Sequence, residues 1–376
     1  MRICIVHQNL EAGGAERQLI QLALQWQGMG HHVEVVLLEH QGVWLNDLDG
    51  KIIVRCLSQR LPRNSILRIY WMWWLVTGLR QYFLQHPFDV VLTFLWLPTL
   101  ISAFALRQMP ERPMTVWSVQ SDLVQEFRLH RDGWVRQWLV RTFLPGHIDH
   151  FIAISSGIKL KTKNLLGVSA ERFTIIPNSL NLAQICKMAV SQGELPDKTA
   201  ATRMVSVGRL HPAKGMDVLL EALALVRNEM GNWECYILGD GPERERLSQL
   251  ARQLNLNNHV HFVGYAQNPY TWLETADLFV LPSRWETFGI AIIEAMALGL
   301  PVIATATDGA SDIITHDVDG YLVPVGDAQA LALAIKRLIN EPKLRQRLGR
   351  NAKARAKVFD VCGIAQKYIS LFNRRD

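Results

Sequence analysis

The sequence alternates short apolar segments with helical stretches in two successive series, and this alternation limits the folds open to the chain. The first series of apolar segments runs through 2–7, 32–38, 52–56, 89–94, 114–119, 150–154 and 174–177. The second series runs through 204–207, 233–238, 260–263, 278–281, 301–304 and 320–323. Short strands separated by helices form parallel sheets that are covered on both faces. We therefore predict an α/β protein of two doubly wound, Rossmann-like domains.

The boundary between the two predicted domains lies where the periodicity is lost. Residues 187–202 have no apolar repeat and gain Gly, Pro and polar residues, which is typical of a linker. We expect a first domain at 1–186, the linker at 187–202 and a second domain at 203–360.

Composition excludes several classes of protein. The 5 Cys are scattered and include no C-x-x-C pair, so we expect reduced thiols and a cytoplasmic location. No apolar run reaches the roughly 18 residues that a membrane-spanning helix needs, and the N-terminus does not resemble a secretion signal. No nucleic-acid recognition motif appears, so we expect no nucleic-acid partner.

Basic and aromatic residues gather in the first half of the chain. Residues 1–180 contribute +5 of the net charge of +6. Within 62–85, Tyr70, Trp71, Trp73 and Trp74 are flanked by arginines. Such a helix can lie at a membrane interface or pack its aromatic rings against a sheet. We expect peripheral membrane contact through 62–85, at the inner face of the plasma membrane, with packing on the sheet as the alternative.

Two cations follow the first strand of the second series. Arg209 and Lys214 come directly after 204–207, within VGRLHPAKG. In open α/β sheets the ligand crevice lies beyond the carboxyl ends of the strands. A guanidinium and an ammonium group at that edge can neutralise a diphosphate and its leaving-group charge. The alternative is a pair of ordinary surface cations.

Glycines follow other predicted strands at the same edge. Gly239 and Gly241 flank Asp240 after 233–238, and Gly264 ends the strand at 260–263. Glycine lets the backbone approach a ligand closely. Asp240 itself can contact a ligand or serve as a turn residue.

The segment LPSRWETFGIAIIEAMALGLPVIAT, at 281–305, combines a loop, a helix and a strand. Glu286 lies in the loop and Glu294 about one turn into the helix. The first N–H groups of a helix are unsatisfied and bind phosphates, whereas carboxylates accept hydrogen bonds from hydroxyl groups. Phosphate and hydroxyl groups occur together in a sugar nucleotide, so this segment predicts a sugar-nucleotide site.

These motifs, in this order, resemble glycosyltransferase family 4, whose members are retaining enzymes of the GT-B architecture. The resemblance extends over nearly the whole chain, from the turn at 13–16 to DGYLVPVGD at 319–327. It implies two Rossmann-like domains that face a cleft, with the acceptor on the first and the sugar nucleotide on the second. It also implies that a last helix, at 361–376, packs back on the first domain.

The resemblance also implies roles for individual residues. Arg209, Lys214 and Glu286 would form the catalytic set, with the two cations on the donor diphosphate and Glu286 on the donor sugar. Glu294 would accept hydrogen bonds from the ribose. The remaining donor-binding residues would be Gly14, Gly239, Gly264, Thr287, Phe288 and Gly289.

One departure from the family bears on the mechanism. Many members have a histidine in the first domain where this chain has VWSVQSD, at 116–122. Gln120 and Asp122 are therefore the acceptor-side candidates. Front-face transfer needs no enzymic base when the leaving phosphate takes the acceptor proton. PNSLN, at 177–181, also departs from the usual family sequence.

The sequence predicts a retaining glycosyltransferase that moves a hexose or N-acetylhexosamine from a nucleotide-diphosphate sugar. Uridine diphosphate is the expected carrier, and guanosine diphosphate mannose is the main alternative donor. The acceptor would be a saccharide, expected to be lipid-linked, in cell-surface polysaccharide or glycan assembly. No Asp-x-Asp motif lies where a metal would act, so we expect neither metal nor cofactor. The alternatives are a catalytically weak sugar-nucleotide-binding subunit and a nucleotide-sugar epimerase.

Overall fold

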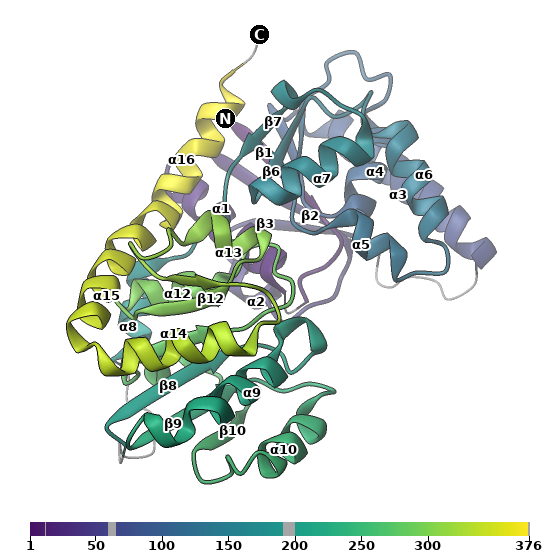
Figure 1. Cartoon of the computed structure of the whole chain (residues 1–376). Helices are drawn as coiled ribbons and strands as arrows, with labels where there is room; N and C mark the ends of the chain where they lie inside the picture. The colour runs from purple at the N-terminus through teal and green to yellow at the C-terminus, as the bar shows by residue number, and fades with distance from the viewer. Residues whose placement is uncertain (12, 59–64, 191–199, 375–376) are drawn as a thin grey trace. The chain divides into compact units, whose positions relative to one another are not determined.

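The computed structural model describes residues 1–11, 13–58, 65–190 and 200–374 of the chain (Figure 1). It divides into two compact units. The first unit comprises Met1–Ser179 and Val361–Asp376, and the second comprises Leu180–Asp360. Both are parallel sheets with helices on their faces, which is the fold class that the alternating pattern predicts.

The sheet of the first unit has seven strands in the order β3-β2-β1-β4-β5-β6-β7. The strands are β1 (Arg2–His7), β2 (His32–Glu39), β3 (Ile53–Ser58), β4 (Val90–Thr93), β5 (Met114–Val119), β6 (His150–Ala153) and β7 (Phe173–Ile175). The helices are α1 (Gly14–Gly28), α2 (Leu45–Leu48), α3 (Ser65–Gln85), α4 (Trp96–Leu106), α5 (Leu123–Arg128), α6 (Gly133–Phe143), α7 (Ser156–Leu166) and α16 (Val361–Phe372).

Alternate residues of the central strand β1 enter two different cores. Ile3 and Ile5 pack in the core that α1 and α16 cover. Cys4 and Val6 pack in the core that α3 and α4 cover. A parallel strand that is buried on both faces reads as a continuous apolar run, and RICIVH is such a run.

Helix α16 belongs to the first unit although it ends the chain. It packs against α1, and Trp26 of α1 donates a hydrogen bond from Nε1 to the carbonyl of Ala365 at 3.2 Å. The Trp26 ring also meets Tyr368 and Phe372 edge-on.

The sheet of the second unit has six strands in the order β10-β9-β8-β11-β12-β13. The strands are β8 (Thr202–Val207), β9 (Trp233–Leu238), β10 (Val260–Gly264), β11 (Leu278–Leu281), β12 (Val302–Thr305) and β13 (Tyr321–Val323). The α-helices are α8 (Leu182–Ala189), α9 (Met216–Val226), α10 (Arg244–Gln253), α11 (Pro269–Glu274), α12 (Ile290–Ala297), α13 (Asp308–Ile313), α14 (Ala328–Asn340) and α15 (Pro342–Ala356).

The structure moves the predicted boundary at residue 186 back to Ser179. Helix α8 belongs to the second unit because it packs against α11 and α12, where it buries Ile185 and Ala189. Lys187 and Met188 are its last turn rather than linker residues, and Asn268 donates a hydrogen bond to the Met188 carbonyl at 2.9 Å. Of the rest of the expected linker, 191–199 lie outside the described residues, and β8 already begins at Thr202.

The two points where the chain passes between the units are adjacent. Leu180 donates a backbone hydrogen bond to the Phe359 carbonyl at 2.9 Å and forms an isolated parallel bridge with Asp360. Just before the crossing, Ser179 donates to the side chain of Gln18 from its N–H at 2.7 Å and from its hydroxyl at 3.1 Å. The segment PNSLN, which departs from the family sequence, therefore holds the end of the first unit in place through the hydrogen bonds of Ser179 to Gln18.

Candidate active site

The strand order of the second unit creates a switch point between β8 and β11. These two parallel strands are neighbours, and the chain leaves β8 toward β9 on one side and β11 toward β12 on the other. The connections that follow the two strands therefore diverge at their carboxyl ends, which is where open α/β sheets bind ligands. The loops at 208–215 and 282–289 begin at this place, and they hold most of the residues that the sequence singles out.

The two loops are joined through their backbones. The N–H of Arg284 donates to the carbonyl of Ala213 at 2.8 Å. Gly215 has a positive φ of 61°, and a Cβ at this position would lie 2.2 Å from the carbonyl oxygen of Pro282. Only glycine combines this backbone conformation with so close an approach. The two loops are consequently held together and form one continuous surface.

Lys214 and Glu286 form an ion pair across this surface. The Lys214 ammonium contacts Oε2 of Glu286, and the hydroxyl of Ser283 lies 3.4 Å from the same oxygen. The two side chains are 25% and 15% exposed, so both groups remain accessible to a ligand. The structure thus brings together two of the three predicted catalytic residues.

Arg209, the third predicted catalytic residue, lies two positions after β8 and is exposed. No group among the described residues accepts a hydrogen bond from its guanidinium group. Its five donors therefore remain available to an anion at the switch point.

A second ion pair, which the sequence did not indicate, holds the Glu286 loop to helix α9. Arg284 binds Asp217 with two hydrogen bonds, of 2.7 and 2.9 Å, in a forked geometry. Arg246 approaches the same carboxylate at 3.3 Å. Burial alone would raise the pKa of Asp217, but the hydrogen bonds and charge of Arg284, with help from Arg246, lower it.

We call the Arg284–Asp217 ion pair the clamp. Its only signal in the nearby sequence was Asp217 itself, an acidic residue in the first turn of the helix that follows Lys214. That signal ordinarily indicates a favourable interaction with the helix dipole. The partner of Asp217 lies 67 residues away in the sequence, so the spacing of residues could not show the pair.

Glu294 is buried in α12, and one of its partners is a tyrosine that the sequence did not single out. The exposed fraction of Glu294 is 5%. The hydroxyl of Tyr270, at the start of α11, donates to its Oε1 at 2.8 Å. This contact fixes the direction of the carboxylate, which the resemblance assigns to the ribose.

The predicted donor-binding glycines after β9 and β10 lie next to each other. Gly239 donates a backbone hydrogen bond to the carbonyl of Gly264 at 2.7 Å. Gly239 has a φ of 130°, and a Cβ there would lie 2.1 Å from the carbonyl oxygen of Gly208. These glycines thus bring the β9 and β10 ends close to the loop that carries Arg209.

Thr287, Phe288 and Gly289 lead directly into α12. Gly289 precedes the helix with a φ of 99°, and Phe288 is buried with its ring 6.0 Å from that of Phe359. Behind this turn, Gly309 donates to the carbonyl of Glu286 at 3.1 Å. The beginning of α12, with its unsatisfied N–H groups, is therefore held beside Glu286.

The other predicted site residues belong to the first unit. Gly14 is the first residue of α1. The amide of Gln120 donates to the hydroxyl of Ser118 at 2.9 Å, which in turn lies 3.2 Å from the Tyr368 hydroxyl. Gln120 is therefore connected to α16 through Ser118.

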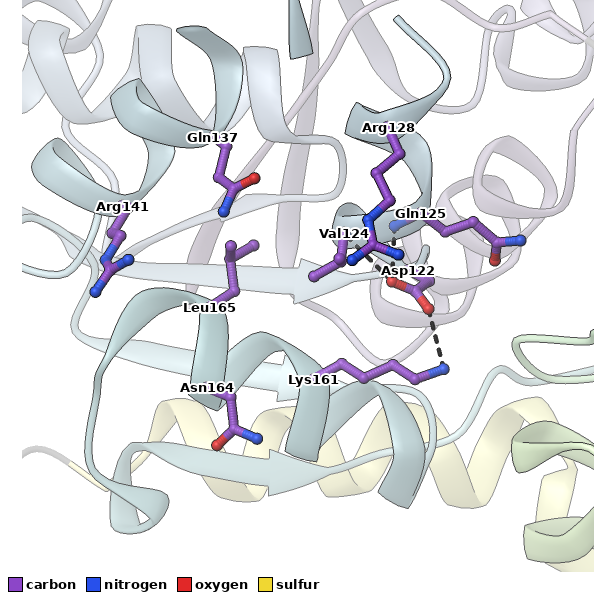
Figure 2. Close-up of a pocket in the computed structure, with 9 residues that line it drawn as sticks. All are labelled: Asp122, Val124, Gln125, Arg128, Gln137, Arg141, Lys161, Asn164 and Leu165. Atoms are coloured by element: carbon purple, nitrogen blue, oxygen red, sulfur yellow. Dashed lines mark hydrogen bonds and ion pairs between the residues drawn. The ribbon is translucent and has the colours of Figure 1, made fainter. Parts of the chain in front are cut away.

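Asp122 has two structural contacts. It caps α5, because its Oδ1 accepts from the N–H groups of Val124 and Gln125 at 3.1 Å each. Its Oδ2 forms an ion pair with Lys161 of α7 at 3.0 Å. Figure 2 shows these contacts at one end of a pocket that α5, α6 and α7 line.

Within the described residues, no three His, Cys, Asp or Glu side chains gather in a way that could hold a metal ion. The charges at the switch point are instead those of Arg209, Lys214 and Glu286. This arrangement offers two cations for an anionic group and a carboxylate for hydroxyl groups.

Two family models match the chain in succession. The model of Glycosyltransferase Family 4 matches residues 12–184, and that of glycosyl transferases group 1 matches 192–355. The chain belongs to glycosyltransferase family 4. Its two units have the GT-B fold of this family.

Curated relatives of this family member are also named as glycosyltransferases. The N-acetylgalactosamine-N,N'-diacetylbacillosaminyl-diphospho-undecaprenol 4-alpha-N-acetylgalactosaminyltransferase of Campylobacter jejuni is 26% identical over 364 residues, which is 95% of each chain. The lipopolysaccharide core biosynthesis glycosyltransferase LpsD of Rhizobium meliloti is 36% identical over 49% of this chain. That match spans about half, 53%, of the relative.

Solved structures of similar chains have the same fold. Anabaena HepE in complex with UDP superposes with a TM-score of 0.82, at 24% identity, over 99% of both chains. WaaG, a glycosyltransferase involved in lipopolysaccharide biosynthesis, superposes with a TM-score of 0.71 at 20% identity, over 99% of this chain and 100% of that one.

Proposed function

We propose that this family member is a retaining glycosyltransferase that takes a hexose or N-acetylhexosamine from a nucleotide-diphosphate sugar. The observation that carries the proposal is the meeting of Lys214 and Glu286 at the switch point. The guanidinium group of Arg209, on the same loop as Lys214, has no partner among the described residues. Two cations suit a diphosphate, and a carboxylate suits sugar hydroxyl groups.

Uridine diphosphate is the proposed carrier. HepE, a structural neighbour, has been solved with UDP and with UDP-glucose. The buried Glu294, which Tyr270 orients, supplies a carboxylate for the two ribose hydroxyl groups.

The proposed reaction exchanges one C1–O bond for another on the same face of the donor sugar. The bond from C1 to the diphosphate breaks, and a bond from C1 to the acceptor oxygen forms. The acceptor proton passes to the leaving phosphate oxygen, so no side chain has to act as base. Arg209 and Lys214 stabilise the charge that develops on the leaving diphosphate, and no metal is required.

The proposed acceptor is a lipid-linked saccharide of cell-surface polysaccharide or glycan assembly. This part rests on the names of the relatives: one acts on a diphospho-undecaprenol saccharide, and another belongs to lipopolysaccharide core biosynthesis. A cytoplasmic enzyme at the inner face of the plasma membrane would have access to such an acceptor.

Peripheral contact through 62–85 is part of this proposal. Of this segment, 62–64 lie outside the described residues. Helix α3 buries Trp71, Leu75 and Leu79 against the sheet, whereas Tyr70, Trp73 and Trp74 are exposed. Packing on the sheet, the alternative, therefore accounts for one side of the helix and leaves three aromatic rings for the interface. Within the described part of the chain, no helix is long and apolar enough to cross a bilayer.

The test combines ligand binding with turnover. A nucleotide sugar that binds only the folded protein raises its melting temperature, so a panel of UDP and GDP sugars identifies the donor. With that donor and a lipid-linked acceptor, Arg209→Ala and Lys214→Ala should each lower kcat by about 10²–10³-fold. Lys336→Ala, which removes an exposed lysine paired with Glu229, is the matched control.

Three outcomes would contradict the proposal. Unchanged turnover in both variants would contradict the assignment of the site. Binding of the donor without transfer or hydrolysis would favour the sugar-nucleotide-binding subunit, and release of free nucleotide sugar isomers without an acceptor would favour the epimerase. The anomeric configuration of the product, read by NMR, tests retention.

A further inference from the structure

The first unit contains a pocket of which the sequence singled out only Asp122, an acceptor-side candidate that lies at one end of it. It has a volume of about 590 Å³ and lies between α5, α6 and α7. Figure 2 shows polar side chains that project into it from all three helices. They are Gln125 and Arg128 of α5, Gln137 and Arg141 of α6, and Lys161 and Asn164 of α7.

The acidic groups around this pocket are satisfied within the protein. Asp122 caps α5 and pairs with Lys161 at 3.0 Å. Glu126 accepts a hydrogen bond from the hydroxyl of Ser121 at 2.6 Å. Asp132 pairs with Arg136 at 3.0 Å. Asp122 and Asp132 are therefore already paired with cations, whereas Glu126 is held by a neutral hydroxyl group.

The arginines at the pocket remain unneutralised. Arg128, Arg131 and Arg141 are exposed, and no group in the described part of the chain accepts a hydrogen bond or ion pair from them. Arg128 and Arg141 line the pocket itself, and Arg131 lies in the turn between α5 and α6. The region thus offers free guanidinium donors of the kind that bind phosphate in a forked geometry.

Helices α5 and α6 and the turn between them form a helical hairpin, and large apolar side chains project from it into solvent. Leu129, Trp134 and Trp138 are 82%, 75% and 56% exposed. Trp134 and Trp138 stand three residues before Gln137 and Arg141 on α6, so the tryptophans and the pocket-lining residues share one side of that helix. The hairpin is held closed at Gly133, where a Cβ would lie 1.8 Å from the carbonyl oxygen of Phe127.

We propose that the α5–α6 hairpin binds an anionic phospholipid surface, with a lipid phosphate in the pocket and Leu129, Trp134 and Trp138 in the interfacial layer. Tryptophan is enriched at the boundary between lipid headgroups and acyl chains, and arginine beside it attracts anionic headgroups. A soluble phosphorylated sugar would use the arginines but would leave the three apolar side chains in water. The combination of charge and exposed apolar surface therefore favours the lipid.

This proposal concerns a different segment from 62–85 and does not depend on sugar transfer. The full-length protein is mixed with vesicles of phosphatidylglycerol and phosphatidylcholine, or of phosphatidylcholine alone, without donor or acceptor. We expect co-sedimentation with the anionic vesicles and its weakening by added salt. Because an arginine near an anionic surface contributes about 1 kcal/mol, Arg128→Gln with Arg141→Gln should weaken binding by about thirtyfold.

The matched control removes two exposed cations elsewhere, by Lys343→Gln with Arg350→Gln on α15. This variant should bind the anionic vesicles more than tenfold more tightly than the arginine pair variant, since it keeps the pocket. Equal binding by the two variants would overturn the proposal, because the effect would then be one of net charge.

A second measurement reports insertion of the tryptophans. Lipids brominated on the upper acyl chain should quench the fluorescence of the wild-type protein. Trp134→Ser with Trp138→Ser should remove a measurable part of that quenching, and the part that remains would belong to Trp73 and Trp74 of α3. Unchanged quenching would overturn the proposal. So would a result in which the arginine pair variant keeps its vesicle binding and loses only the binding of glucose 6-phosphate, since the pocket would then serve a soluble phosphate. Unaltered circular dichroism spectra establish that each variant is folded.

Discussion

The two units share a strand order but differ at the carboxyl ends of the two central strands, where that order reverses. We call these strand ends the first edge in the first unit and the second edge in the second unit. In the second unit, the ends of β8 and β11 carry Lys214 and Glu286 in accessible positions. In the first unit, the ends of β1 and β4 carry His7 and Phe94, whose rings meet edge-on at 6.1 Å, and His7 is fully buried. The topology supplies an equivalent edge twice, and the side chains decide what that edge can bind.

The His7 ring at the first edge is uncharged and is also difficult to protonate. His7 donates a hydrogen bond from Nδ1 to the carbonyl of Asn9 at 2.6 Å, and its Nε2 is buried with no partner among the described residues. Burial lowers the pKa of His7 to about 4, although the hydrogen bond to Asn9 acts in the opposite direction. The ring is therefore neutral in the folded protein at ordinary pH.

The largest expected effect tests this property of the first edge. Between pH 6.5 and 4 the unfolded chain binds a proton at His7 that the folded chain does not, so the free energy of unfolding falls as the pH falls. The expected loss is about 3 kcal/mol, at 1.36 kcal/mol for each pKa unit. Urea unfolding of the wild type and of His7→Gln over this pH range measures it. Equal pH dependence in the two proteins would assign the loss to other groups.

The next effect tests the charge at the second edge. Glu286→Gln keeps the shape of the side chain but removes the charge that holds Lys214, and it alters the contact proposed for the donor sugar. We expect kcat/KM to fall by about 10²-fold, because small misplacement of reacting groups has effects of that size. Initial rates at varied donor concentration measure it, with Glu341→Gln, which affects an exposed pair with Arg337, as the control. A rate within a factor of about three of the wild type would contradict the contrast between the two edges.

A smaller effect should come from the clamp behind that edge. Arg284→Lys keeps the charge but cannot make two parallel hydrogen bonds to Asp217. We expect about a tenfold lower kcat/KM, because the Glu286 loop is held less firmly to α9. A double-mutant cycle with Asp217→Asn should give clearly less than additive losses, since both variants break one contact. Additive losses would show that the two residues act separately.

The lowered pKa of Asp217 adds a pH signature to the clamp. A carboxylate whose pKa is lowered on folding stabilises the folded state above its unfolded pKa, and this stabilisation is lost as the pH falls through the folded pKa. The clamp should therefore persist through the pH range in which His7 acts. The acid loss attributed to His7 should then be the same in Asp217→Asn as in the wild type.

The smallest effects compare helix caps in the two units. Asp122 caps α5 in the first unit, and Asp327 caps α14 in the second by accepting from Ala330 at 2.9 Å. Each change to alanine should lower the free energy of unfolding by about 1 kcal/mol. Thermal unfolding measures both. A much larger effect for Asp122→Ala would mean that its ion pair with Lys161 contributes more than an exposed pair usually does.

Most of the fold could be predicted from the periodic spacing of apolar residues in the sequence. The run RICIVH could be assigned to a buried strand because both of its faces are apolar, and the helix at 290–298 was marked by its pattern and by Gly299 after it. The boundary between the units was predicted too late because α8 is a short helix. Its burial against α11 and α12 depends on contacts with residues far along the chain.

The candidate site was predictable where glycines and charges follow strands directly. Arg209, Lys214 and Glu286 could be found in this way, because the carboxyl ends of parallel strands share one edge. The same reasoning could not find Asp217, Arg284 or Tyr270, since the role of each depends on a partner residue in another helix or loop. The roles of all the predicted site residues are still predictions, Arg209, Lys214 and Glu286 included, and the variants above begin to test them.

The position of α16 has a consequence for biosynthesis. The first unit lacks one of its covering helices until residues 361–372 have been made, and until then Trp26 has no Ala365 carbonyl to bind. The whole second unit, Leu180–Asp360, is translated in the meantime. Since domains fold as units while the ribosome advances, the unit that begins first should be completed last, and a ribosome that stalls before residue 361 should leave the apolar face of α1 uncovered.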